Sequence, residues 1–111
     1  MPAPARVELQ HALSELRNAA EAIKVYEPAA VERLQALVRQ HAALLKSEAL
    51  GGDAAAQRDR IAGQLDAVLN AVERAARYPA QITARADVLD RAGALGKMIR
   101  VLQGLLDPQA R

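Results

Sequence analysis

Apolar side chains recur at alternating steps of three and four residues in four segments that together cover most of the chain. This spacing places side chains on one face of an α-helix, so each segment predicts an amphipathic helix with one face to bury. The pattern predicts helices over about residues 5–25, 28–50, 54–77 and 80–106. The four stripes consist of Leu9, Leu13, Leu16, Ala20 and Ile23; of Val31, Leu34, Val38, His41 and Leu45; of Ile61, Leu65, Val68, Val72 and Ala75; and of Val88, Ala92, Leu95, Ile99, Leu102 and Leu106.

Prolines and glycines mark the boundaries between these segments. Pro28 disfavours helical geometry at Glu27 and is itself favoured at the first position of a new helix. Gly51 and Gly52 can adopt the left-handed conformation that often follows a helix, and Asp53 can cap the next helix. So short a connection makes the second and third helices antiparallel neighbours.

We therefore expect an all-α fold and a single domain over residues 1–111, a small antiparallel four-helix bundle in up-down-up-down order. Two alternatives stay open. The connection before Pro28 is short and lacks glycine, so one proline-kinked long helix competes with a reversal, which we favour. Gly93 and Gly96 could divide the fourth helix, which we expect to be continuous.

Alanine dominates the apolar fraction, because the chain has 26 alanines, two tyrosines and neither Phe nor Trp. Alanine favours helices, but its burial stabilises far less than the roughly 1.5–3 kcal/mol of a buried leucine. We therefore expect a thin core that gains stability by burial against another protein or a second copy. Each tyrosine directly precedes a proline junction, Tyr26 with Pro28 and Tyr78 with Pro79. Cysteine is absent and no apolar run approaches the roughly 20 residues of a membrane helix, so we expect a cytoplasmic protein with no membrane partner.

Positive charge is mildly concentrated in the last third of the chain. The net charge is +2, and residues 74–111 carry seven Lys/Arg against three Asp/Glu. A nucleic-acid or anion binder that uses this arginine-bearing third is one alternative function. The basic residues form no compact cluster and no aromatics are interleaved with them, so nucleic acid is not the partner that we favour.

His41 occupies a stripe position between Val38 and Leu45 where a leucine is expected. We interpret it as a structural residue whose ring packs while one nitrogen reaches water or a neighbour; a proton switch, a metal ligand or a phosphoacceptor is the functional alternative. The segment from His41 to Gly52 resembles the motif of histidine phosphotransfer domains, a histidine followed by a lysine–glycine pair and a further glycine. That family places the lysine three residues after the histidine, whereas Lys46 is five after His41. The resemblance implies a phosphotransfer protein with His41 as phosphoacceptor.

Nothing else in the chain predicts catalysis, a metal site or a cofactor. Glu8 and His11 match one Glu-x-x-His step of a di-iron bundle, but such a site needs a second step and further glutamates. The remaining carboxylates lie near arginines or helix starts, and Glu73 with Arg77 has the spacing of an exposed ion pair. We therefore expect no enzyme, no cofactor and no metal.

Leucines outside the stripes carry the information about partners. Leu37, Leu44, Leu69 and Leu105 widen the apolar faces, as a four-helix core requires. They could instead form an apolar groove that accepts a partner helix. The leading interpretation is a non-enzymatic protein-interaction module, such as an adaptor, an export-type chaperone or an assembly subunit. In general character the chain is similar to flagellar and type III export chaperones, which are small Ala/Leu-rich helical proteins that sequester partner helices.

Overall fold

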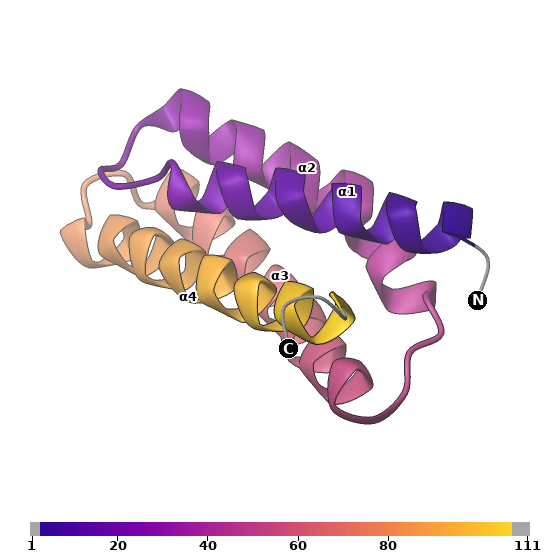
Figure 1. The fold of residues 1–111 in the computed structure, drawn as a ribbon. Coiled ribbons are helices and arrows are strands. Elements are labelled where there is room, and N and C mark those ends of the chain that lie inside the picture. Colours follow the sequence, from indigo (N-terminus) through magenta and orange to yellow (C-terminus); the bar gives the residue numbers. More distant parts are fainter. Residues whose placement is uncertain (1–2, 108–111) are drawn as a thin grey trace.

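The computed structural model describes residues 3–107, with side chains from Arg6 onward, and these residues form four helices (Figure 1). Successive helices run antiparallel and pack against each other, and α4 also packs against α1, which closes the ring. The predicted all-α bundle with up-down-up-down order is confirmed. The helices are α1 (Ala3–Glu21), α2 (Pro28–Ser47), α3 (Gly52–Arg77) and α4 (Ile82–Leu106).

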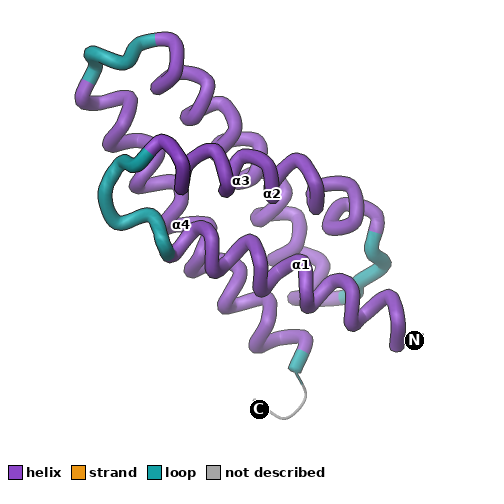
Figure 2. Tube along the Cα trace, turned by 90° about the horizontal axis from the view of Figure 1, so that it is seen from above, coloured by secondary structure: helices purple, strands orange, loops and turns teal. Residues whose placement is uncertain are grey.

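The two ends of the bundle differ. The α1–α2 loop and the α3–α4 loop lie at one end, whereas the α2–α3 loop lies at the other end with the start of α1 and the end of α4 (Figures 1 and 2). Tyr26 lies in the first of these loops and Tyr78 begins the second. We call this the tyrosine end, and the other the opposite end.

Every residue of the four predicted stripes is buried. The bulk of the core comes from leucine and isoleucine, and Leu13, Leu65 and Ile99 have no exposed surface. Buried residues from all four helices belong to one cluster, so the helices share a core. The three-and-four spacing therefore identified the core faces correctly.

The first helix ends at Glu21, four residues earlier than predicted, and the chain reverses over residues 22–27 instead of kinking. Ile23 is still buried although it lies outside the helix. The apolar spacing thus indicated burial beyond the helix end, which is why the predicted helix was too long. Pro28 is the first residue of α2, as predicted.

The junction between α2 and α3 differs from the prediction in detail. α2 ends at Ser47, and the N-cap of α3 is Gly51, so the prediction that Asp53 caps this helix is wrong. The left-handed glycine is Gly52, with a φ of 57°, and it stands at the start of α3 instead of the end of α2. Asp53 lies in the first turn, where its charge suits the helix dipole.

Two glutamines of α3 fix its register against α4. Gln57 Nε2 donates to the carbonyl oxygen of Met98 at 3.0 Å, and Gln64 Nε2 donates to that of Arg91 at 2.9 Å. The two donors are seven residues apart and so are the two acceptors, as a single antiparallel register requires.

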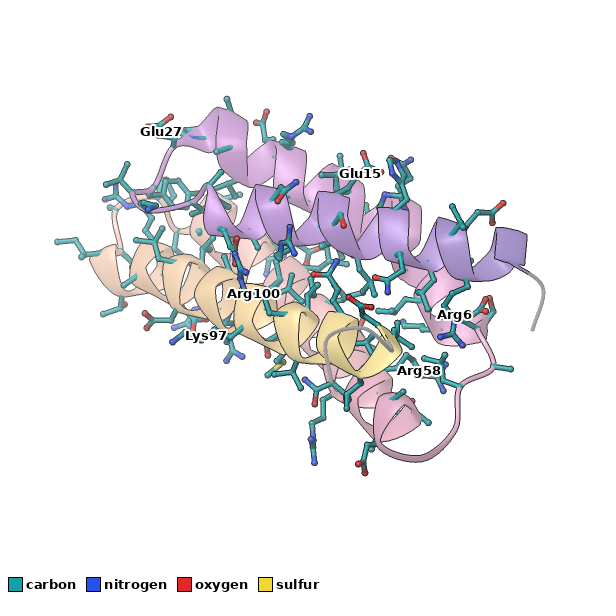
Figure 3. The ribbon with its side chains drawn as sticks, in the orientation of Figure 1. Arg6, Glu15, Glu27, Arg58, Lys97 and Arg100 are labelled. Atoms are coloured by element: carbon teal, nitrogen blue, oxygen red, sulfur yellow. The ribbon has the colours of Figure 1, made fainter. Side chains whose placement is uncertain are left out.

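The contact between α1 and α4 joins distant parts of the chain. Glu21 accepts hydrogen bonds from Nε and Nη2 of Arg100 at 2.5 and 2.9 Å. Figure 3 labels Arg100 on α4. These bonds hold the pKa of the Glu21 carboxyl below its usual range and raise the pKa of Arg100. Gly96 lies beneath the Glu21 side chain, because a Cβ at position 96 would come within 3.1 Å of Glu21 Cγ. α4 remains helical through Gly93 and Gly96, as predicted.

Candidate functional site

An open pocket of about 500 Å³ lies between α2 and α3 at the tyrosine end. The α1–α2 loop, the first turns of α2 and the last turns of α3 form its walls. Its position follows from local sequence signals, because Pro28 sets the start of α2 and the Tyr78-Pro79 junction ends α3. We call it the tyrosine-end pocket; it is lined by Tyr26, Pro28, Val31, Glu32, Gln35, Val72, Glu73, Ala76 and Arg77.

The floor of this pocket is apolar and its rim is charged. Val31 and Val72 are buried members of the core stripes, and the half-buried Tyr26 packs against the core beside them. Glu32 and Glu73 are exposed on the two helices that flank the floor. An apolar centre with a polar rim is the composition of protein interfaces and of ligand sites. The pocket therefore suits an apolar group that arrives with charged neighbours.

Two smaller hollows continue the pocket around the C-terminal half of α3. The hollow next to the pocket shares Glu73 and Arg77 with it. The second hollow lies between α3 and α4 and shares Asn70 and Arg74 with the first. Because these lining residues are shared, this part of α3 forms a ridge with hollowed surface on either side. We call it the α3 ridge; the shared residues are Asn70, Glu73, Arg74 and Arg77.

Five large apolar side chains of the described residues are strongly exposed, and three of them lie at the tyrosine end. These are Val25 in the α1–α2 loop (61% exposed), Tyr78 at the C-cap of α3 (46%) and Ile82 at the start of α4 (76%). The other two, Val7 and Val101, lie toward the opposite end. Exposed apolar groups at the same end as an apolar pocket mark this end as a candidate interaction surface.

The charges on the α3 ridge are not paired within the described part of the chain. Glu73 and Arg77 have the spacing of a helical ion pair, yet neither makes an ion pair or a side-chain hydrogen bond with any described residue. Asp87 and Arg91, which have the same spacing on α4, do pair at 3.1 Å. The predicted Glu73–Arg77 pair does not form, and within the described part of the chain neither side chain has a charged partner.

His41 is buried, and its Nε2 lies 3.0 Å from Oε1 of Glu15. Figure 3 labels Glu15 on α1. The same carboxylate oxygen lies 3.4 Å from Nε2 of His11. This geometry, a packed ring with one nitrogen bound to a neighbour, is the one expected of a histidine with a structural role. A phosphoacceptor needs an accessible ring nitrogen, and Lys46 lies 3.6 Å from Asp66 on α3, away from the α1 side to which His41 is bound.

The Glu-x-x-His step near the N-terminus does not form a pair, because His11 contacts Glu15 and Glu8 is exposed. Among the described residues, no three His, Cys, Asp or Glu side chains lie where they could hold a metal ion together. None of the described helices combines the length and the hydrophobicity that crossing a membrane requires.

The four leucines predicted to form a partner groove lie on three helices, α2, α3 and α4. Leu37 is buried in the core, and Leu44 on α2, Leu69 on α3 and Leu105 on α4 are half-buried.

Two arginines of the last third lie on different sides of α4. Arg91 pairs with Asp87, and Arg100 pairs with Glu21 on the side of α4 that faces α1 (Figure 3). These two arginines are nine residues apart, which puts them about half a turn out of phase around α4. Arg91 and Arg100 therefore lie on different faces of α4. Arg111 lies outside the described residues.

The described residues thus define an antiparallel four-helix bundle with an apolar pocket and exposed apolar side chains at one end. Comparison of the chain with protein-family models found no match, and comparisons with curated proteins and with solved structures found no significant match. Its function has to be inferred from its own surface.

Proposed function

We propose that this chain is a non-enzymatic protein-interaction module that binds a partner protein through the tyrosine end. The observation that carries the proposal is the tyrosine-end pocket together with the exposed Val25, Tyr78 and Ile82 at the same end. Covering these groups removes apolar surface from water, which contributes roughly 25 cal/mol for each Å². The adaptor, chaperone and assembly roles considered from the sequence all use this mode of binding.

The placement of the aromatic residues supports this proposal. Tyr26 and Tyr78 are the two aromatic residues of the chain, and both lie at the tyrosine end. Tyrosine is enriched in the energetic centres of interfaces, because its ring gives a large contact area and its hydroxyl finds a polar partner. A chain that otherwise builds its core from aliphatic side chains presents both rings where a partner can contact them.

The rigidity of the walls also favours binding. Two helices form most of the pocket, and Pro28 fixes the backbone at the point where α2 begins. A partner therefore meets a preformed surface and loses little affinity to the ordering of loops.

Two exposed valines provide a matched test. Val25 lies at the tyrosine end, and Val101 (53% exposed) lies toward the opposite end. Because both are on the surface, aspartate at either position should change the free energy of unfolding by only about 0.5 kcal/mol. We expect Val25→Asp to weaken partner binding by about tenfold or more and Val101→Asp to leave it unchanged.

The measurement is affinity capture of the wild-type chain from its native host, identification of the bound protein and titration calorimetry with that protein purified. Equal binding by both variants, or loss in Val101→Asp alone, would exclude the tyrosine end as the binding surface.

A further inference from the structure

The second hollow beside the α3 ridge has a basic lining. It has a volume of about 240 Å³ and lies between the C-terminal half of α3 and the first half of α4. Two arginines and one aspartate give its lining a net positive charge, and two alanines leave the space between the helices open. We call it the α3–α4 hollow; it is lined by Ala67, Asn70, Ala71 and Arg74 of α3 and by Asp87 and Arg91 of α4.

The antiparallel packing of α3 and α4 turns the two arginines toward each other. Gln64 donates to the carbonyl oxygen of Arg91, which sets these two residues at the same level along the bundle. Arg74 follows Gln64 by ten residues, so its backbone lies about 15 Å farther along α3. Long side chains on a helix lean toward its N-terminus, so Arg74 leans toward Asn70 and Arg91 leans toward Asp87. Because the two helices run in opposite directions, the guanidinium groups approach each other from the two ends of the hollow.

Several hydrogen-bond donors of this lining have no acceptor among the described residues. Arg74 is exposed and makes no hydrogen bond or ion pair within the described part of the chain, and the same holds for the side chain of Asn70. Arg91 is held by Asp87, but both bonds of this pair, at 3.1 and 3.2 Å, come from Nε. The pair therefore does not use the two terminal amino groups of Arg91. The hollow thus gathers two guanidinium groups and one carboxamide that can donate to a bound acceptor.

A phosphate group is the acceptor that suits these donors. Arginine binds carboxylates and phosphates through two parallel N–H bonds from its planar fork. A carboxylate has two oxygens, which one fork occupies, whereas a phosphate group has at least three and can accept from arginines on two sides. A phosphate monoester carries a charge of about −1.5 to −2 at pH 7, which two guanidinium charges match.

We propose that the α3–α4 hollow binds a phosphate group between Arg74 and Arg91, with Asn70 as a further donor. Asp87 opposes the anion with one charge, but its bonds to Nε hold Arg91 in place beside the hollow. The phosphate is either the inorganic ion or the monoester of a small molecule. This site lies on the side of α3 that faces α4, whereas the tyrosine-end pocket lies on the side that faces α2, so the inference does not depend on the proposed function.

Titration calorimetry of the whole chain with inorganic phosphate at about pH 8, where a phosphate group is a dianion, tests this site. We expect saturable binding of one phosphate per chain. Arg74→Gln and Arg91→Gln should each weaken this binding by about tenfold or more, because each removes charge-assisted hydrogen bonds. Arg74→Lys keeps the charge but loses the fork, and it should also bind phosphate more weakly than the wild type.

Arg39→Gln is the matched control. Arg39 is exposed on α2, which does not pack against α4, and it makes no ion pair with any described residue. The substitution removes the same charge as Arg74→Gln but leaves the hollow intact, so we expect phosphate binding to be unchanged. Val25→Asp, at the tyrosine end, should also leave it unchanged. Circular dichroism verifies that the helices of each variant are intact.

A parallel titration with glycerol phosphate distinguishes the two sources of the phosphate group. Tighter binding than that of inorganic phosphate supports the site and identifies a monoester as its ligand, whereas equal or weaker binding supports it with the inorganic ion as ligand. In both cases the losses in Arg74→Gln and Arg91→Gln should be the same.

The amide signals of an NMR titration locate the bound phosphate. Shifts centred on residues 67–74 and 87–91 support the α3–α4 hollow, and shifts confined to other segments would overturn it. The absence of saturable binding by the folded wild type at millimolar phosphate would overturn the inference as well. So would equal losses in Arg39→Gln and Arg74→Gln, because they would show that net charge alone attracts the anion.

Discussion

At the scale of single residues, Gly96 costs α4 up to about 1 kcal/mol of helix propensity relative to alanine, and the structure shows what uses the space. The Glu21 side chain crosses α4 at this position, with its Cγ 3.1 Å from where a Cβ would stand. This path brings the carboxylate to Arg100, 79 residues away in the sequence. The absence of a side chain at Gly96 therefore supports a contact between the first and last helices.

Two glycine substitutions on the same helix measure this role. Gly93→Ala should raise the free energy of unfolding by up to about 1 kcal/mol, because a Cβ there meets nothing within 4 Å. Gly96→Ala should gain less or destabilise, since Glu21 has to shift. Urea denaturation measures both. In a Glu21→Ala background the two substitutions should agree within about 0.5 kcal/mol, and a difference that persists there would contradict this explanation.

At the scale of helices, the apolar spacing predicted which faces are buried but not how the faces are joined. Gln57 lies four residues before Ile61 and so continues the third stripe, yet its polar side chain kept it out of the predicted core. That spacing was the signal of its burial. Its partner Met98 could not be predicted, because the hydrogen bond depends on the register of α3 against α4. The tyrosine-end pocket could not be predicted either, because it forms only where α2, α3 and the α1–α2 loop pack together. The sequence predicted the apolar face of each helix but not how these faces meet.

Substitutions at Gln57 test this register contact. The side chain is 6% exposed, so Gln57→Ala should lower the free energy of unfolding by about 1 kcal/mol or more through two lost hydrogen bonds, the one donated to Met98 and the one accepted from Arg60. Gln57→Glu should cost about 1–2 kcal/mol at pH 7, because one carboxylate oxygen would face the Met98 carbonyl while the other keeps its bond from Arg60.

The pH dependence of stability distinguishes the loss of the hydrogen bond to Met98 from the cost of burying a charge at position 57. Burial raises the pKa of a glutamate at position 57, so the variant should regain stability as the pH falls and the protonated acid donates to Met98. Urea denaturation at pH 7 and near pH 4.5 measures this, with Gln64→Glu as the less buried control. Equal losses at both pH values would contradict the assigned hydrogen bond.

At the scale of the whole molecule, the up-down-up-down order explains why both tyrosines meet at one end. The first and third connections of such a bundle lie at the same end, and these are the connections that carry Tyr26 and Tyr78. The proline junctions in the sequence located both tyrosines at helix ends. The exposure of Tyr78, and the lack of an ion pair from Glu73 or Arg77 to any described residue, depend on packing and required the structure.

Closure of the ring between α1 and α4 should depend on pH. The hydrogen bond from Arg100 lowers the pKa of Glu21 in the folded protein, so the unfolded chain takes up this proton at higher pH than the folded chain. The contribution of Glu21 to stability is therefore complete above the ordinary pKa of a glutamate and is lost as the pH falls through the lowered value. Glu21→Gln should lower the thermal midpoint at pH 7, and its difference from the wild type should shrink below about pH 4.

Thermal melts from pH 7 to pH 3 measure that difference, with Glu8→Gln as the control, because Glu8 is exposed on the same helix and has no ion pair with any described residue. The pair is on the surface, so 1 M salt should reduce the effect of Glu21→Gln at pH 7 through screening. A difference that stays constant from pH 7 to pH 3 would show that Glu21 acts through packing over Gly96 and not through its charge. The pH profile thereby separates the two ways in which this side chain can hold the first helix against the last.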